Sequence, residues 1–425
     1  MKSDLDALMQ ARNFDTLVVL GNAEHNPPMY YFVGGGHVSD ALLIKKRGEA
    51  PVLFYNDMER GEAARSGLKI RPFSEIDLAE LQKQADGDSS LALAMRFQKI
   101  LEDFDLTRGR IGVYGQVEFS WAFGMITNLQ SLMPDVEFIA EAGMDSIFLK
   151  AMETKDESEV ERIRKMGKIT TEVVRRVQTL LTNSDVRNDE VLLNDDGSPL
   201  TIGDVKSKIE LWLAELGAEN PEGTIFAIGH DAGVPHSSGN PTDLMRLGQT
   251  VVFDIFPCER GGGYFYDFTR TWSLGYATPE TQELYNQVYE IYNKLADNFD
   301  LNAPFKDYQR MTCEYFESKG HASLLNSKAP FNGYVHSLGH GVGLNIHERP
   351  FSHLTVGDDH RLAPGVIITS EPGLYYPEKG MGVRIEDTIW VRPDGRMEIL
   401  AEYPYDFVLP MKKWKKKKLS RNGHG

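Results

Sequence analysis

Cysteine is nearly absent from this chain. Only Cys258 and Cys313 occur among its 425 residues, which leaves room for one disulfide at most. That is too few to stabilise a secreted fold of this size, so we expect a protein of the reducing cytoplasm.

Positive charge and long apolar runs are scarce as well. Lysine and arginine number 46 against 62 acidic residues, for a formal net charge of −16. An acidic surface repels nucleic acids and anionic membranes. No apolar run approaches the length of a bilayer span, and the N-terminus turns acidic where a signal peptide would turn apolar. We therefore expect no nucleic-acid partner, no membrane contact, and a small-molecule or peptide substrate.

Basic residues gather only at the end of the chain. Residues 411–425 form a lysine-rich tail. A solvated terminus is the plain interpretation, and a contact with an anionic partner is the alternative.

The hydrophobic content of 41% is enough for well-formed cores in two or three domains. Up to about residue 149, short β-branched runs alternate with helical patterns, which predicts an α/β domain over residues 1–152. A long amphipathic helix then opens a second domain over residues 153–410. Within it, residues 183–203 have the composition of a loop, and Thr278-Pro279-Glu280 predicts a helix start.

The most unusual stretch is His336-Ser-Leu-Gly-His340-Gly-Val-Gly-Leu-Asn-Ile-His347-Glu348. Three of the eleven histidines lie in it, separated by glycines 339, 341 and 343. We expect these glycines to allow turns that other residues resist. Such a pattern indicates a site more than a core.

Carboxylates adjoin apolar, β-rich runs at four other places. They are Asp254, Asp267, Glu371 and Glu386. Strands over residues 251–256 and 264–271, joined by a glycine-rich turn, would bring the two aspartates onto one face. Neighbouring carboxylates repel each other unless a cation lies between them. With His340 they form an oxygen-dominated set that suits two divalent ions.

Together these motifs resemble the pita-bread metallopeptidases of family M24, in the branch of Xaa-Pro aminopeptidases, prolidases and creatinases. The matching motifs are Asp254, Asp267-Phe-Thr-Arg, the histidine stretch, Ser-Glu371-Pro-Gly-Leu-Tyr and Val-Arg384-Ile-Glu386-Asp-Thr. The resemblance implies an N-terminal creatinase-like, mixed-sheet α/β domain followed by a pita-bread catalytic domain.

The resemblance also implies a role for each motif residue. Asp254 would bind one metal, His340 and Glu371 the other, and Asp267 and Glu386 both. A hydroxide between the ions would be the nucleophile and Glu371 the general base. The substrate-facing histidines would be His236, His336 and His347, with His230 as the nearby alternative to His236. Arg384 would hold the acidic groups.

The implied activity is hydrolysis of the Xaa-Pro bond at peptide N-termini, by an aminopeptidase or a dipeptidase. Two manganese ions are the expected cofactors, with cobalt, iron or zinc as substitutes, and a homodimer is the expected assembly. The alternatives are a creatinase-like C–N hydrolase or another non-peptide hydrolase, and a peptide-binding module without activity.

Overall fold

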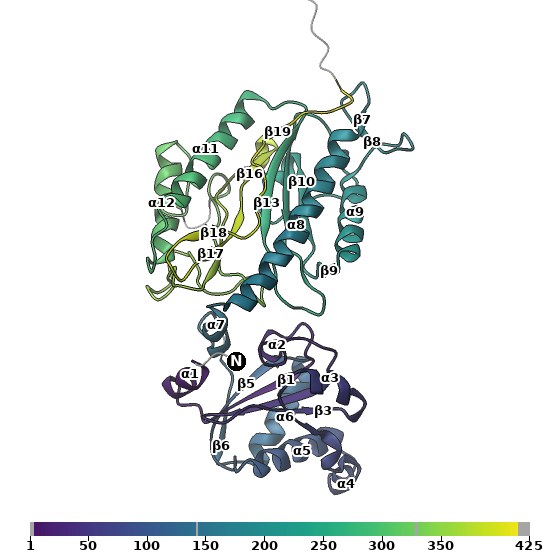
Figure 1. Ribbon diagram of the computed structural model, residues 1–425, viewed down its shortest axis with the longest axis vertical. Coiled ribbons are helices and arrows are strands. Elements are labelled where there is room, and N and C mark those ends of the chain that lie inside the picture. Colours follow the sequence, from purple (N-terminus) through teal and green to yellow (C-terminus); the bar gives the residue numbers. More distant parts are fainter. Residues whose placement is uncertain (1–3, 142, 328–329, 415–425) are drawn as a thin grey trace, which may run out of the picture. The chain divides into compact units, whose positions relative to one another are not determined.

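The computed structural model describes residues 4–141, 143–327 and 330–414, which form two compact units (Figure 1). The N-terminal unit extends to Glu153 and includes Arg260–Gly263. The C-terminal unit comprises Thr154–Glu259 and the chain from Tyr264 onwards. Of the predicted basic tail 411–425, residues 415–425 lie outside the described residues.

The N-terminal unit is built on a six-stranded mixed sheet of order β4-β3-β2-β1-β5-β6. The strands are β1 (Thr16–Gly21), β2 (Ala41–Lys46), β3 (Val52–Tyr55), β4 (Lys69–Pro72), β5 (Gly109–Gln116) and β6 (Val136–Ile139). β1 is parallel to β5 and antiparallel to β2. The helices are α1 (Leu5–Ala11), α2 (Pro27–Val33), α3 (Arg60–Arg65), α4 (Leu78–Gln84), α5 (Ser89–Asp103), α6 (Phe119–Leu132) and α7 (Ile147–Met152), with short 3-10 turns η1 (Asp57–Glu59) and η2 (Phe73–Glu75).

Alternation along the strands divides the core of this unit. Val18, Leu42 and Phe54 point to one face, where α5 and α6 pack. Leu17 and Leu43, one residue away, are also buried. Because both faces are covered, the strands are apolar throughout.

The C-terminal unit contains a four-stranded sheet of order β10-β11-β13-β19 and a three-stranded sheet of order β14-β17-β18. The strands are β7 (Asp185–Val186), β8 (Leu192–Leu193), β9 (Ala218–Glu219), β10 (Thr224–Ile228), β11 (Thr250–Ile255), β12 (Cys258–Glu259), β13 (Phe268–Leu274), β14 (Ile367–Ser370), β15 (Gly373–Tyr376), β16 (Met381–Arg384), β17 (Asp387–Val391), β18 (Met397–Ile399) and β19 (Val408–Leu409). The helices are α8 (Glu157–Asn183), α9 (Ile202–Glu215), α10 (Gly229–Ala232), α11 (Pro279–Ala296) and α12 (Phe305–Ser318), with the 3-10 turn η3 (Pro377–Lys379).

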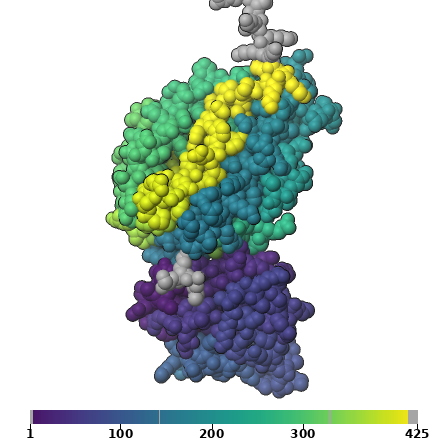
Figure 2. Space-filling model, in the orientation of Figure 1, coloured from purple at the N-terminus to yellow at the C-terminus, as the bar shows by residue number. Residues whose placement is uncertain are grey.

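Helices flank these strands on two sides. α8 and α9 pack together on one side, and α11 and α12 on the other (Figure 1). Figure 2 shows the C-terminal segment, in yellow, running as a band over the surface between them. A capping box formed by Asp156 and Glu159 starts α8, and Thr278 caps α11 ahead of Pro279. These are local signals that the sequence carries by itself.

Two expectations from the sequence need correction. Residues 183–203, expected as a loop, contain the short hairpin of β7 and β8. The strand expected over residues 264–271 begins only at Phe268. The reason is that the amides of Phe265 and Tyr266 donate to Gly343 and Pro257, so they are not available to pair with β11.

Among the described residues, no helix combines the length and the apolar character that a bilayer crossing needs.

Candidate metal centre

Two buried strands position the aspartates. β11 pairs antiparallel with β13, with Asp254 opposite Thr269. Asp267 lies two residues before Thr269, and side chains two apart in an extended chain share a face. The aspartates are only 7% and 5% exposed. The predicted pairing of these carboxylates on one face is therefore what the fold produces.

The histidine stretch is held along the neighbouring strand β14. The amide of Thr369 donates to the carbonyl of His340 at 2.8 Å, and the amide of Glu371 to that of Leu338 at 2.8 Å. These bonds place His340 beside Glu371, directly after β14. Glu386 lies between β16 and β17, where its carboxylate accepts a hydrogen bond from Thr269 Oγ1 at 2.7 Å.

Close packing, not backbone freedom, explains the glycines of this stretch. None of glycines 339, 341 and 343 has a positive φ. A Cβ at Gly341 would instead lie 2.0 Å from the carbonyl oxygen of Arg349, and one at Gly339 would lie 2.2 Å from that of Thr369. The expectation of special turns at these glycines is thus wrong, and the space is occupied by neighbouring backbone at Gly339 and Gly341 and by the side chain of Glu348 at Gly343.

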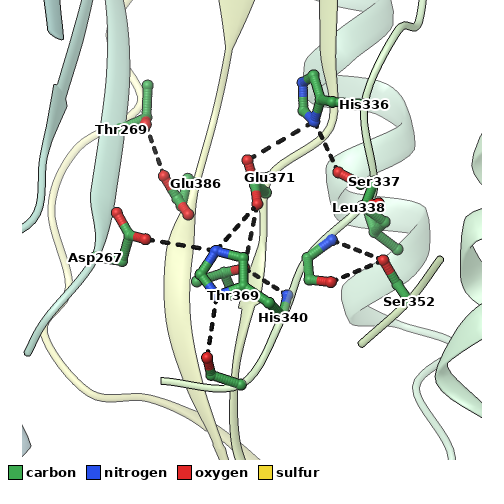
Figure 3. Close-up of polar contacts among 12 residues, drawn as sticks. Asp267, Thr269, His336, Ser337, Leu338, His340, Ser352, Thr369, Glu371 and Glu386 are labelled. Atoms are coloured by element: carbon green, nitrogen blue, oxygen red, sulfur yellow. Dashed lines mark hydrogen bonds and ion pairs between the residues drawn. The ribbon is translucent and has the colours of Figure 1, made fainter. Parts of the chain in front are cut away.

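Four of the five candidate ligands lie together in Figure 3, namely Asp267, His340, Glu371 and Glu386. Potential ligand atoms of Asp267, His340 and Glu386 all lie within 4.8 Å of one another. His340 Nε2 is 3.6 Å from Asp267 Oδ2 and 3.5 Å from Glu371 Oε1. Its Nδ1 is 3.0 Å from the carbonyl oxygen of Gly341, an arrangement that directs the Nε2 lone pair towards the carboxylates when Nδ1 carries the proton.

Burial and mutual repulsion dominate the electrostatics of the site. Burial, and then the charge of Glu386, raises the pKa values of Asp267 and Glu371 well above their usual range. Burial, and then Asp254, raises the pKa of Glu386 to about 8. Burial also lowers the pKa of His340 to about 3. Without a cation, burial therefore favours the protonated carboxyls of Asp267, Glu371 and Glu386 and the neutral imidazole of His340.

These residues fit divalent metal ions. The set contains four carboxylates and one imidazole, and Asp254 Oδ1 is buried without a hydrogen-bond partner in the described part of the chain. A buried carboxylate oxygen is costly unless it is paired. Oxygen-rich sets of this kind favour hard or borderline divalent cations.

A buried arginine connects the aspartates to one of the predicted histidines. Arg384 forms an ion pair with Asp254 and donates to the hydroxyl of Tyr375 at 2.7 Å. That hydroxyl is 2.9 Å from Nε2 of His336. Burial and the Arg384 charge lower the pKa of His336 to about 3, so His336 is a neutral imidazole at neutral pH.

The other two predicted histidines lie at the rim, where both are exposed. The rings of His347 and His340 are 4.3 Å apart between centroids. His236 is close enough to His336 to lower its pKa further. The Nδ1 atom of His230 is 3.5 Å from Oδ1 of Asp231, its neighbour in sequence.

Sequence reasoning assigned no role to Tyr375 or Thr269. Both belong to quoted motifs, at the ends of Glu371-Pro-Gly-Leu-Tyr and Asp267-Phe-Thr, and both occupy strands. Thr269 lies two residues after Asp267 and shares its face, a signal that alternation could have revealed. Tyr375 gives no such signal, because the chain passes from β14 to another sheet between Glu371 and Tyr375.

This chain is similar to known metallopeptidases. The profile described as metallopeptidase family M24 matches residues 161–393, more than half of the chain. The Xaa-Pro dipeptidase of Pyrococcus horikoshii is 26% identical over 396 residues, covering 93% of this chain and 92% of that protein. The Xaa-Pro dipeptidase of Pyrococcus furiosus is 27% identical over 319 residues, covering 74% and 81%.

Solved structures show the same fold. The prolidase from Pyrococcus horikoshii has a TM-score of 0.70 at 22% identity, with 95% of this chain and 98% of that chain covered. The X-Pro aminopeptidase from Thermotoga maritima has a TM-score of 0.71 at 21% identity, with 93% and 97% covered. The predicted pita-bread fold class is confirmed. With more than half of its length matched by the family profile, this chain belongs to metallopeptidase family M24.

Proposed function

We propose that this chain is a dinuclear metal-dependent exopeptidase that hydrolyses the Xaa-Pro bond at peptide N-termini. The observation that carries the proposal is the buried cluster around Asp267, His340 and Glu386, with Asp254 and Glu371 beside it. Relatives that align over most of this chain are Xaa-Pro dipeptidases, which supports this substrate class. Residues 153–410 form the catalytic domain in this proposal and residues 1–152 a separate α/β domain.

In the proposal the five ligands divide between two ions. Asp254 would hold one ion, His340 and Glu371 would hold the other, and Asp267 and Glu386 would serve both. The distance of 3.5 Å between His340 Nε2 and Glu371 Oε1 supports the proposal that these two residues share an ion. When bound, the ions would supply an activated water and polarise the peptide carbonyl. We propose manganese as the native ion, with cobalt, iron or zinc as substitutes.

The surrounding residues supply protons and orientation. Glu371 is the proposed general base, because its buried carboxylate already has a raised pKa and lies between His340 and His336. Arg384 prevents Asp254 from turning away by pairing with its second oxygen. His336, His347 and His236 orient the peptide.

Proline suits this arrangement for a chemical reason. An Xaa-Pro bond is a tertiary amide without an N–H, so a protease that recognises that donor cannot hold it. A site that acts on the carbonyl does not need the donor. The acidic centre also attracts a free N-terminal amine, which restricts cleavage to the first bond.

Of the three alternative functions, another non-peptide hydrolase is separated by the substrate test below, and the other two need no metal-ligand set. A creatinase-like C–N hydrolase resembles this fold but works without the metal-ligand set, and a peptide-binding module has no need of one. The buried, partnerless oxygen of Asp254 favours the metal-dependent enzyme over both.

The test is turnover with added Mn²⁺ on an Xaa-Pro dipeptide, an Xaa-Pro-Xaa tripeptide, the matching Xaa-Ala peptides, an N-acetylated peptide and creatine. We expect release of one residue from the Xaa-Pro substrates and at least about tenfold slower cleavage of Xaa-Ala. The dipeptide-to-tripeptide ratio separates a dipeptidase from an aminopeptidase. Equal rates on proline and alanine peptides, or turnover of creatine or of the blocked peptide, would contradict the proposal.

A homodimer is proposed as the assembly. Light scattering coupled to size exclusion would give its mass, and a monomer mass at working concentration would contradict it.

A further inference from the structure

The N-terminal unit contains a cavity that has no part in the candidate metal centre. Its volume is about 950 Å³, near the upper end of the range for small-molecule sites. It opens where the parallel strands β1 and β5 end, at Gly21 and Gln116, and where the chain leaves β3 at Asn56. The carboxyl ends of strands are where open α/β sheets place their ligands.

Aromatic and aliphatic side chains form much of the cavity wall. Leu93 and Phe97 of α5 face it, together with Phe73 of η2 and Trp121 of α6. Trp121 remains 38% exposed. An exposed indole at the edge of an apolar hollow can cover a flat or branched apolar group.

One cation lines the cavity. Nε of Arg96 is buried and has no hydrogen-bond partner among the described residues. The guanidinium carbon lies 5.5 Å from the centroid of the Phe73 ring. The charge of Asp77 acts on Arg96, and Oδ1 of that carboxylate accepts hydrogen bonds from the amides of Ala79 and Glu80. A desolvated guanidinium nitrogen without a partner is costly, and a carboxylate matches its planar donors well.

Three carboxylates also line the cavity, and two of them are engaged. Asp57 accepts a hydrogen bond from Ser74 at 2.7 Å. Glu118 caps α6 by accepting from the amides of Ser120 and Trp121. The carboxylate of Asp40 has no hydrogen bond within the described parts of the chain and is exposed to the cavity mouth.

The charges of the side chains that line the cavity favour some classes of ligand over others. Three acids repel a nucleotide or another multiply charged anion, although the location at the strand ends is common for nucleotides. A zwitterion is different, because its carboxylate can meet Arg96 and its ammonium can meet Asp40. The apolar wall then favours an aromatic or branched aliphatic side group.

We propose that this cavity binds a free amino acid with an aromatic or branched aliphatic side chain, its carboxylate on Arg96 and its ammonium group near Asp40. This site is separate from the peptidase centre, and the inference does not rest on the proposed peptidase activity.

Fluorine NMR of the full-length protein labelled with 5-fluorotryptophan tests this binding directly. The chain has five tryptophans, and Trp121→Phe identifies the signal of Trp121. The probes are L-phenylalanine, 3-phenylpropionate, which lacks the amine, and 2-phenylethylamine, which lacks the carboxylate. We expect L-phenylalanine to shift the Trp121 signal saturably. Each of the other two should bind at least about tenfold more weakly.

The matched variants are Arg96→Gln and Arg108→Gln. Arg108 is an exposed arginine of the same unit that does not line the cavity, so its variant controls for the loss of one positive charge. We expect Arg96→Gln to raise the Kd for L-phenylalanine by about tenfold or more, and Arg108→Gln to leave it unchanged. A Trp121 signal that L-phenylalanine does not move at about 10 mM would overturn the proposal. So would equal affinity for 2-phenylethylamine, or an Arg96→Gln protein that binds like wild type.

Discussion

Burial and metal binding have opposite effects on the protonation of the carboxylates in the metal centre. The fold buries Asp267, Glu371 and Glu386 together and so raises their pKa values. A divalent ion needs the same groups deprotonated. Each acid therefore destabilises the metal-free protein and stabilises the metal-bound one.

Glu386→Gln separates these two effects. The amide keeps the shape of the side chain and removes one charge. We expect metal affinity to fall by at least about 100-fold, while the metal-free variant unfolds at the same or a higher temperature than metal-free wild type. Metal content by elemental analysis and thermal unfolding with and without chelator measure both. His347→Ala is the comparison: it should keep its metal and lose mainly rate. A metal-depleted His347→Ala protein would contradict the assignment of ligands.

The pH dependence follows from the same shift. The pKa of Glu386 rises from 4.5 to about 8 on folding, so the folded metal-free protein holds a proton that the unfolded chain has lost. The contribution of Glu386 to the free energy of unfolding is fully present below about pH 4.5 and is lost as the pH rises towards 8. We expect the free energy of unfolding of the metal-free protein to fall over this window in urea titrations, and to fall less in Glu386→Gln. Metal affinity should change in the opposite direction and increase with pH.

Tyr375 should matter for rate and not for metal content. Its hydroxyl joins Arg384 to His336, and a hydrogen bond to a charged group contributes about 1.5–3 kcal/mol. We expect Tyr375→Phe to lower kcat/KM by roughly tenfold or more with the metal content unchanged. Tyr376→Phe is the control, because that hydroxyl contacts His321 instead. Equal effects of the two variants would show that Tyr375 acts only through packing.

At the scale of elements, the loop that carries the histidines depends on close backbone contact with its neighbours. Gly341 lies against the carbonyl of Arg349, and the buried ion pair of Lys155 with Glu348, 2.7 Å long, supports the same loop. Breaking such a pair leaves a buried charge without compensation. The position of His340 therefore depends on residues with no part in the chemistry.

Gly341→Ala tests this dependence. An added Cβ would be 2.0 Å from the Arg349 oxygen, so the loop must move. We expect a destabilisation of about 2–4 kcal/mol in chemical denaturation and a loss of metal affinity. Gly61→Ala is the matched control, because a Cβ there meets no heavy atom within 4 Å and the residue lies in α3. It should be neutral or stabilising by up to about 1 kcal/mol. A stable Gly341→Ala protein that keeps its metal would contradict the conclusion that the Arg349 carbonyl leaves no room for a Cβ at position 341.

At the scale of the whole molecule, each of the two units contains a hydrophobic cluster built from its own elements. One core gathers side chains of β1 to β3 around α5 and α6, and the other gathers side chains of α11, α12 and the C-terminal strands. All five candidate ligands belong to the second unit.

Metal removal should therefore act on one unit only. A ligand present at 100 times its Kd stabilises the state that binds it by about 2.7 kcal/mol. We expect calorimetry to resolve two transitions, of which chelation lowers only the one assigned to the C-terminal unit. Proteolysis at intermediate temperature identifies which unit has unfolded. Equal shifts of both unfolding transitions would contradict the expectation that metal binding stabilises the C-terminal unit alone.

The sequence alone was sufficient for the family, the fold class and the candidate ligands, because each of these is encoded in short motifs and in local alternation. The motifs around His340, Glu371 and Glu386 identify family M24 without knowledge of any contact, and the caps at Asp156 and Thr278 start their helices locally. The metal roles assigned to these residues stay predictions.

Tertiary structure decided what depends on contacts between distant parts of the chain. The link from Asp254 through Arg384 and Tyr375 to His336 joins three separate segments, and no local pattern specifies it. The raised pKa values need burial, which only the packed fold produces. The glycines of the histidine stretch are required by atoms that the fold packs against them, not by their own φ angles. The unpaired Nε of Arg96 likewise depends on the packing of α5 beside the ends of β1 and β5, since burial and the lack of a hydrogen-bond partner are properties of the folded chain.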